Sequence, residues 1–543
     1  MDNQYGGVKR KVYDPDSQDF TPIYNMVNAA NSKLSVLTTE SLKGFMLNLT
    51  VDKEDSEYLN LRGKRFTEPV TNFILKFVIL TDIPSRDLGY YNGTHKSSES
   101  HESFFNEAKL QQYIWKESIT FGRPAICPSV ANLSMFTAED SLSLMNFFKE
   151  SNANNYQIDT TSESPNPITH NSDVFRFLSN KSQISKPDRG IGLLVMPTIT
   201  QSTTLSQFMG LPINSNFYGK IITYADKFNA VSNAFAQIAR LFVEIGVVHV
   251  DLHSGNIMIY LNSEQEIKCS LIDFGRASNI LSEDDDIYLT KEQKEGVKLV
   301  IKDFKKDLFD LDKEHKDLLK LNQRRKMLFE LSRDQNNFLE FNKYRDELMQ
   351  INAVRDEIRI NEINYMKYVL DYIADFDFSI NNPKYFDDDG ITYQLKWFAQ
   401  YRNYDHLTDN RKKGQYMELF VNAFDILHNM TLLDGNSAGI SADTIKTYER
   451  DGSFINLNTT EGIDAFIVPF PHPVPVDTLP LPEEHNVSAD TVPLPEQDAI
   501  TAETKRRRTV GGRKNKLHKT NKRKNGKSKR NRRNKNKNTR KKR

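Results

Sequence analysis

Two short polar motifs joined by two apolar segments are the feature that most constrains the fold of this chain. The first motif is His249-Val-Asp-Leu-His-Ser-Gly-Asn256, and the second, Asp273-Phe-Gly275, begins seventeen residues later. The segments between them, residues 257–261 and 267–272, are short, rich in isoleucine and separated by polar residues. This pattern predicts an antiparallel pair of strands, which would fold the second motif back against the first.

Asp251, Asn256 and Asp273 are the residue types that phosphoryl transfer requires. One carboxylate has to lie near the attacking hydroxyl group, and two oxygen-bearing side chains have to hold Mg²⁺ on the phosphates of a nucleotide. A chance match is the alternative, but six fixed positions at about one in twenty each give roughly 10⁻⁸ per starting point. We therefore interpret the motifs as parts of a phosphotransferase site that uses ATP and Mg²⁺.

These motifs resemble those of the protein-kinase-like superfamily, whose catalytic loop begins His-Arg-Asp-Leu and whose metal motif is Asp-Phe-Gly. His253 replaces the lysine that is usual in serine/threonine kinases, so Asp-Leu-His-x-Gly-Asn is more similar to the atypical branch, which includes aminoglycoside and choline phosphotransferases. The resemblance covers about residues 33–440. It implies an α+β, two-lobed protein-kinase-like fold, with a small β-rich lobe and a larger helical lobe. It also implies catalytic roles for Asp251, Asn256 and His253, and metal binding by Asn256 and Asp273.

The two histidines of the first motif have different expected roles. The resemblance implies that His249 mainly supports the loop, as buried histidines with satisfied hydrogen bonds usually do. His253 is expected to contact the γ-phosphate. We expect no zinc site here, because no cysteine or second acidic cluster accompanies the histidines at ligand spacing.

The resemblance also implies a lysine on a strand and a glutamate on a helix, both before the catalytic loop. Residues 70–80 form an apolar, β-branched run with Lys76 in its middle, and residues 103–115 have apolar positions at helical spacing with Glu107 near the start. Lys76 is expected to hold the α- and β-phosphates, and Glu107 to pair with Lys76. The alternative is that both side chains face solvent. Burial of Lys76 would disfavour that alternative, because an unpaired buried ammonium is costly.

A glycine-poor turn is the candidate for the loop that covers the phosphates. Residues 34–37 and 45–51 predict two strands, and only Gly44 remains of the three glycines expected between them. Backbone amides of this turn, helped by hydroxyl groups such as that of Ser41, are expected to contact the nucleotide. A plain β-hairpin is the alternative.

The apolar run at residues 191–197 is expected to be the strand that leads into the hinge between the lobes. Backbone groups from Met196 to Thr198 would then contact the adenine edge, although Pro197 has no N–H group to donate. The alternative is an ordinary strand of the core. The strand that precedes a hinge is itself a core strand.

Two insertions are expected within these lobes. Residues 131–187 are rich in Ser, Asn, Thr and Asp, which predicts a flexible insertion. Residues 290–371 are highly charged and contain one Gly and no Pro, which predicts a helical insertion such as a helical hairpin. This second insertion would cover or replace a peptide-binding face or present a surface to a partner, and a solvated helical decoration is the alternative.

Residues 392–433 predict the last helices of the larger lobe.

The remaining boundaries follow from composition. We expect the following division: an N-terminal extension (1–32), the small lobe with its flexible insertion (33–197), the helical lobe with its helical insertion (198–440), a Pro-rich linker (441–504) and a disordered basic tail (505–543). The linker contains the near repeat Thr-Leu-Pro-Leu-Pro-Glu and Thr-Val-Pro-Leu-Pro-Glu, which favours an extended conformation.

The basic tail holds 22 of the 73 Lys and Arg residues and no acidic residue, which leaves 51 basic against 72 acidic residues in the rest of the chain. It also lacks aromatic residues, so it offers attraction to phosphates without base stacking. The tail is expected to contact nucleic acid or an acidic surface, including that of its own chain, or to be a nuclear targeting signal. A solvated basic run is the alternative.

Composition also bears on the compartment. The chain has only two cysteines, no apolar run near the ~20 residues that cross a bilayer, and no signal-peptide character at Met1. We therefore expect an intracellular protein, cytoplasmic or nuclear, without membrane contact. The inserted helices and the Asn/Lys-rich tail also look similar to serine/threonine kinases of giant DNA viruses, which would place the protein in a virion or host cell.

The resulting hypothesis is an ATP- and Mg²⁺-dependent phosphotransferase, with a protein serine/threonine kinase favoured because the insertions and the tail suggest macromolecular partners. A small-molecule kinase of the aminoglycoside or choline phosphotransferase type is the first alternative, supported by His253 and by the absence of an Ala-Pro-Glu marker. A catalytically inactive kinase-like scaffold tethered to nucleic acid is the second, supported by the glycine-poor turn.

Overall fold

The chain divides into two compact units, Met1–Pro473 and Val474–Arg543. All the residues that the structure describes belong to the first unit. This computed structural model describes residues 20–38, 44–53, 70–81, 87–91, 94–120, 123–155, 189–282, 289–331, 338–380, 396–402, 404–430 and 468. Ser41, nearly all of the expected linker and the whole basic tail lie outside the described residues.

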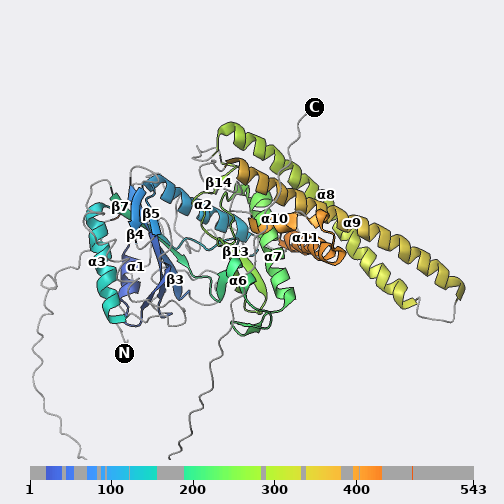
Figure 1. Ribbon diagram of the computed structural model, residues 1–543, viewed down its shortest axis with the longest axis horizontal. Helices are drawn as coiled ribbons and strands as arrows, with labels where there is room; N and C mark the ends of the chain where they lie inside the picture. Colours follow the sequence, from blue (N-terminus) through green and yellow to red (C-terminus); the bar gives the residue numbers. More distant parts are fainter. Residues whose placement is uncertain are drawn as a thin grey trace, which may run out of the picture. The chain divides into compact units, whose positions relative to one another are not determined.

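An antiparallel sheet of five strands forms the first part of the fold, which we call the sheet region (described residues from 20 to 197; Figure 1). The strand order is β1-β2-β3-β7-β6, and a separate hairpin joins β4 to β5. The strands expected on either side of Gly44, around Lys76 and before the hinge are all present. The bounds are β1 Lys33–Thr38, β2 Gly44–Thr50, β3 Asn72–Thr81, β4 Asp87–Tyr91, β5 Thr94–Ser97, β6 Asn132–Phe136 and β7 Arg189–Pro197.

Three helices pack on this sheet: α1 (Thr21–Asn28), α2 (His101–Ile119) and α3 (Ala138–Asn155). Side chains of β3 alternate between the two faces, so its odd-numbered apolar residues join a core with α1 and α3, and its even-numbered ones join a core with α2. Lys76 is even-numbered. The strand therefore directs the Lys76 side chain toward α2.

Two boundaries expected from the sequence are wrong. The expected extension at residues 1–32 includes α1, whose Ile23 and Met26 are fully buried in the sheet core. The expected flexible insertion at residues 131–187 begins with β6 and α3, and β6 pairs with β7. The polar composition of β6 is misleading because its buried polar groups satisfy each other: Ser134 Oγ donates to Asn132 Oδ1 at 2.8 Å. Residues 156–188 lie outside the described residues.

One residue of the expected Pro-rich linker also belongs to the sheet region. Val468 is buried in the core that contains α1 and α3, and its backbone N–H donates to Met135 O at 2.9 Å. At this residue, therefore, the expected linker contributes to the packed core of the sheet region.

The second part of the fold, which we call the helical region (described residues from 198 to 430), is built around α7 (Tyr224–Arg240). A reciprocal capping box starts α7, because Thr223 Oγ1 accepts from Asp226 N at 3.1 Å and Asp226 Oδ2 accepts from Thr223 N at 2.9 Å. The helix ends in a π-helical turn, η3 (Leu241–Ile245). Gly246 follows with φ 77°, a conformation that suits glycine and that directs the chain into the loop at residues 249–256.

Short strands surround that loop. β12 and β13 form the antiparallel pair expected from the sequence, with Ile257 opposite Leu271. β11 pairs with β14, and β8 pairs with β12. The bounds are β8 Ser202–Thr204, α6 Leu205–Gly210, β9 Asn216–Phe217, β10 Lys220–Ile221, β11 Val247–Val248, β12 Ile257–Leu261, β13 Ile267–Leu271 and β14 Ser278–Asn279.

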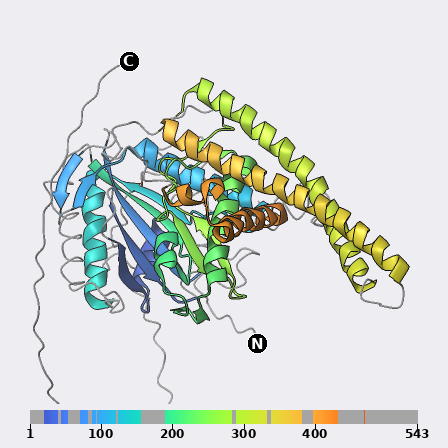
Figure 2. The same ribbon diagram turned by 45° about the vertical axis from the view of Figure 1, so that its right-hand side comes forward.

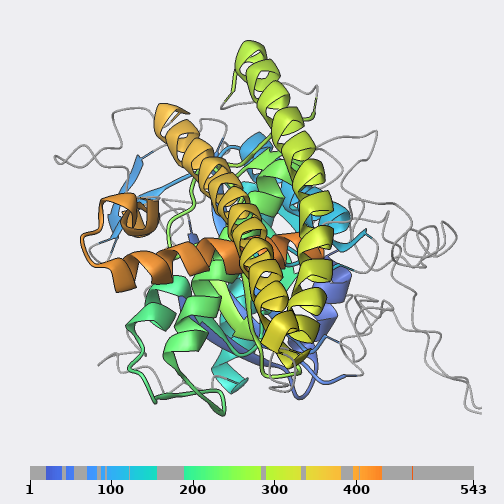
Figure 3. The ribbon, with the colours of Figure 1, turned by 90° about the vertical axis from the view of Figure 1, so that its right-hand side faces the viewer.

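The expected helical insertion is a long hairpin of α8 (Lys291–Leu331) and α9 (Phe338–Ile380), which run side by side in Figure 3. Its proximal half buries Val297, Ile301 and Met366 in the core of the helical region, so the hairpin is more than a solvated decoration. Figure 2 shows α9 crossing beside α11. The last elements are α10 Lys396–Arg402, η6 Tyr404–His406 and α11 Asn410–Met430.

The architecture is thus mixed α+β, with a β-rich part followed by a helical part, as expected. Both hairpin helices are long, but they are highly charged. Within the part of the chain that the structure describes, no helix has both the length and the apolar character needed to span a membrane.

Candidate active site

Lys76, Glu107 and Asp273 come together although they lie on a strand, a helix and a loop. Lys76 Nζ is 2.5 Å from Glu107 Oε1 and 3.1 Å from Asp273 Oδ1. Lys76 and Glu107 are buried, whereas the side chain of Asp273 is 45% exposed. The pairing expected between Lys76 and Glu107 is present, and neither side chain faces solvent. The exposed carboxylate of Asp273 leaves one side of the group open to a ligand.

The carboxylates keep Lys76 charged. Burial disfavours an ammonium, but the negative charges of Asp273 and Glu107 outweigh that effect, so the pKa of Lys76 is raised. For Glu107, burial raises the pKa of the carboxyl group and Lys76 opposes the shift. Because Glu107 Oε1 lies 2.5 Å from an ammonium that keeps its proton, we treat the pair as ionic.

Helix α2 presents Glu107 to the sheet. Ser100 caps the helix, accepting at Oγ from Ser103 N at 3.0 Å, and this cap fixes where the helical turns begin. Phe104, Glu107 and Gln111 then follow at spacings of three and four residues, all of them buried. The face that packs on β3 therefore contains the glutamate.

Gly275 allows the loop after β13 to approach this helix closely. A Cβ at Gly275 would lie 3.3 Å from Glu107 Oε2 and 3.7 Å from Asp273 Oδ1. The preceding Asp273 has φ 64°, an uncommon conformation for a residue with a side chain. Strain of this kind is typical of functional loops, where the surrounding structure holds it in place.

The loop from Asp251 to Asn256 is closed by its own hydrogen bonds. Asn256 Nδ2 donates to Asp251 O and Asn256 N donates to His253 O, both at 2.9 Å. Asn256 O in turn accepts from Ile272 N at 3.0 Å, next to Asp273. The loop-closing bonds use the amide nitrogen of the Asn256 side chain and do not involve its Oδ1. An amide oxygen of this kind is a ligand type that binds Mg²⁺.

The two histidines lie in different settings. His249 is buried, its Nε2 is 2.9 Å from Ile272 O, and its ring is 4.8 Å from that of Phe274. Burial lowers the pKa of His249, and the neutral ring links the first motif to the second, in line with its expected supporting role. His253 Nδ1 accepts from Gly255 N at 3.0 Å, so this ring is held by its own loop.

The expected adenine contacts are only partly available. Thr198 N donates to Asn72 O at 2.9 Å, so this amide is already used by β3 and a purine would need other backbone groups. The Met196 side chain faces α2, where Gln111 Nε2 is 3.4 Å from its Sδ. Gly44 is the first residue of β2, opposite Val78, and Ser41 lies outside the described residues.

Two residues close to the site are absent from the expected set. Glu99 is buried, accepts from Ser103 Oγ at 2.5 Å and contributes to the raised pKa of Lys76. Trp397 Nε1 donates to Leu252 O, inside the loop from Asp251 to Asn256, at 2.9 Å. The helix cap that follows Glu99 is a weak sequence signal that Glu99 lies near the site. No local pattern predicts the contact of Trp397, because Trp397 is far from the loop in sequence.

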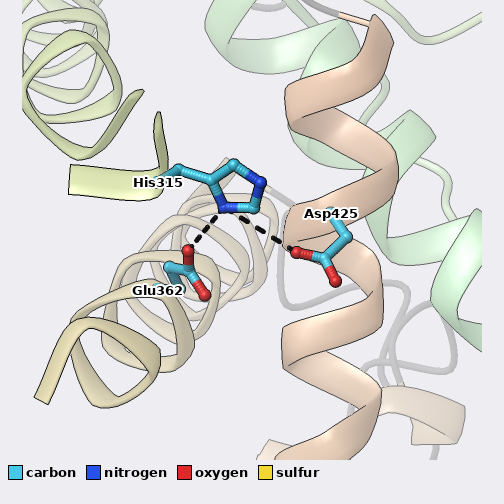
Figure 4. Close-up of side chains that lie close together, drawn as sticks. All are labelled: His315, Glu362 and Asp425. Carbon is cyan, nitrogen blue, oxygen red and sulfur yellow. Dashed lines mark hydrogen bonds and ion pairs between the residues drawn. The ribbon is translucent and has the colours of Figure 1, made fainter. Parts of the chain in front are cut away.

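A second cluster of titratable side chains lies where the hairpin meets α11 (Figure 4). His315 Nδ1 is 2.8 Å from Glu362 Oε1 and 4.0 Å from Asp425 Oδ1, and such groups are common metal ligands. Arg359 Nη1, however, is 2.7 Å from both Glu362 Oε2 and Asp425 Oδ1. A cation of the protein is thus already paired with both carboxylates. We therefore interpret the cluster as an ionic link between three helices.

No protein-family model matches the chain, and a search of curated proteins finds no match. The resemblance to the protein-kinase-like superfamily therefore stays a prediction from the motifs at residues 249–256 and 273–275, and function has to be inferred from the geometry around them.

Proposed function

We propose that the protein is an ATP- and Mg²⁺-dependent phosphotransferase that acts on serine or threonine hydroxyl groups of proteins. One observation carries the proposal: the buried ammonium of Lys76 contacts the carboxylates of Glu107 and Asp273 at the same time. Phosphoryl transfer needs a fixed cation beside the phosphates and a metal-binding carboxylate next to it. The α+β architecture is compatible with the two-lobed kinase-like fold that the motifs imply.

Each residue of the group has a role suited to its setting. Lys76 would hold the α- and β-phosphates, and Glu107 would fix the direction of the Lys76 side chain. Asp273 is exposed enough to bind a metal ion while it touches Lys76, and Asn256 Oδ1 offers a second oxygen ligand. Bound Mg²⁺ would neutralise charge on the phosphate oxygens.

Asp251 would act on the acceptor. A carboxylate within hydrogen-bonding reach of the attacking hydroxyl orients it and accepts its proton. The backbone of Asp251 is held by Asn256, which keeps the residue at a fixed place in the loop. His253 follows on the same loop and would contact the γ-phosphate.

A small hydroxyl compound is the second candidate acceptor, and one observation favours it. Only residues 276–290 separate Gly275 from the start of α8 at Lys291, which leaves a short segment for a peptide platform. His253 supports the same alternative through its similarity to aminoglycoside and choline phosphotransferases. An inactive scaffold tethered to nucleic acid is disfavoured, because Lys76, Glu107 and Asp273 keep their mutual contacts.

The test compares the full-length protein with Asp251→Asn and with Asp317→Asn, a control on the exposed face of α8. Transfer of label from γ-labelled ATP is measured on casein-type proteins and on a panel of small hydroxyl compounds, alongside the thermal shift caused by ATP and Mg²⁺. We expect labelled protein, a rate about 10²–10⁴-fold lower in Asp251→Asn, and equal thermal shifts in all three proteins. Label on small molecules alone would select the second candidate. No transfer and no thermal shift would overturn the enzyme proposal.

A further inference from the structure

Three successive carbonyl groups in the catalytic loop are hydrogen-bonded. Those of Asp251 and His253 accept from the side chain and the backbone of Asn256, each at 2.9 Å. The carbonyl between them, Leu252 O, accepts from Trp397 Nε1, also at 2.9 Å. The first two bonds close the loop on itself, and the third comes from α10. The bonds to Asp251 O and Leu252 O hold the planar peptide units on either side of Leu252, and with them the backbone between Asp251 and His253.

The rings around Trp397 hold it against the core of the helical region. Its ring centroid is 5.8 Å from that of Phe235 on α7, and Phe398 and Tyr401 on α10 pack on the same Phe235 at 5.4 and 5.6 Å. Leu252 is 1% exposed, so its carbonyl lies in a buried setting where an unmade hydrogen bond is costly. Both partners of the indole bond are therefore anchored.

We infer that Trp397 is a positioning residue for the transfer step, which holds the loop backbone that carries Asp251 through the carbonyl of Leu252. The inference rests on the proposed phosphotransferase function and names a residue outside the motifs that suggested it. The indole N–H of Trp397 bonds to the backbone of Leu252, whereas the group that would hold the nucleotide is Lys76 and Asp273. Loss of the indole N–H should therefore slow transfer and leave nucleotide binding nearly unchanged, because near-attack geometry depends on Asp251.

The first test uses full-length Trp397→Phe, which keeps an aromatic ring and removes the N–H donor. Tyr401→Phe is the matched control, since it removes a hydroxyl group from the same helix and the same ring cluster. We expect Trp397→Phe to lower kcat about tenfold, with KM for ATP within about twofold of wild type, and Tyr401→Phe to change neither. Rates are normalised to the fraction that binds ATP and Mg²⁺, so that partial unfolding is not counted as slower chemistry.

A second measurement tests the hydrogen bond from Trp397 to Leu252 independently of enzyme activity. The chain has two tryptophans, so ¹⁵N-indole labelling gives two signals, and Trp115→Phe assigns them. We expect slow hydrogen exchange at the Trp397 indole. Fast exchange there, or a normal normalised kcat in Trp397→Phe, would overturn the inference while leaving the proposed function intact. A wild-type protein that binds no nucleotide and transfers no phosphate, even to water, would overturn both.

Discussion

The ammonium of Lys76 is held in place by two ion pairs. It is almost completely buried and touches two carboxylates, one from α2 and one from the loop after β13. Removing one member of such a group leaves the opposite charge buried without compensation, which costs more than the pair contributes to stability. Stability and activity should therefore respond differently to single and double substitutions.

We predict that Lys76→Met lowers the free energy of unfolding by about 3–5 kcal/mol, because Glu107 then stays buried without its cation. Adding Glu107→Gln should restore most of that loss. Neither variant should bind ATP and Mg²⁺ normally, because both lack the ammonium that would hold the phosphates. Urea denaturation measures the first effect and calorimetric titration with ATP and Mg²⁺ the second.

Lys302→Met, on the exposed side of α8, is the control for the loss of one lysine. It should leave both stability and nucleotide binding unchanged. If Lys76→Met bound ATP as the wild type does, the assignment of Lys76 to the phosphates would be wrong, whatever its effect on stability.

Three elements meet at the ionic link between the hairpin and the rest of the helical region. Glu362 on α9 is fully buried and is shared between His315 on α8 and Arg359 on α9, and Arg359 also reaches Asp425 on α11. The link ties both arms of the hairpin to one helix of the helical region. It supplements the apolar contacts of residues such as Ile301 and Met366.

We predict that Arg359→Met destabilises the protein by about 2–4 kcal/mol, because Glu362 and Asp425 lose their shared cation. Hydrogen exchange should increase in α8 and α9 before it increases in the sheet region. Lys320→Met removes a lysine from an exposed ion pair on the same hairpin and should cost less than about 1 kcal/mol. Equal effects of the two substitutions in chemical denaturation would contradict the role given to the link.

Charge is distributed very unevenly over the chain. The net charge is +1, yet the last 39 residues contain 22 Lys and Arg and no acid, and the rest carries an excess of 21 acidic residues. A basic segment of this kind binds polyanions through counterion release, without reading sequence, and the affinity falls steeply with salt. The same composition lacks the aromatic side chains that stack on bases.

We predict that deletion of residues 505–543 abolishes binding to both single- and double-stranded nucleic acid at low salt and leaves phosphotransfer to a small or peptide acceptor unchanged. Fluorescence anisotropy with labelled oligonucleotides of unrelated sequence measures the binding. The affinity of the full-length protein should fall by orders of magnitude between 50 and 200 mM salt. Salt-independent binding, or binding that survives the deletion, would show that another surface is responsible.

Periodicity and motifs in the sequence indicated most of the strands and helices around the candidate site. The alternation of β3, the helical spacing around Glu107 and the antiparallel pair between Asn256 and Asp273 are local patterns, so the residues themselves specify them. The same holds for the hairpin, because a long charged stretch without proline favours helix. The expected group of Lys76, Glu107 and Asp273 followed from these elements together with the resemblance.

Tertiary structure decided what local patterns cannot specify. α1 was assigned to an N-terminal extension and β6 to a flexible insertion, because the burial of α1 in the sheet core and the pairing of β6 with β7 depend on segments far away in the chain. The contact of Trp397 with Leu252 and the occupation of the Thr198 amide by Asn72 are likewise set by packing between distant segments. The periodicity of a strand or helix determines the face from which each of its side chains points. The fold determines which group that side chain then contacts.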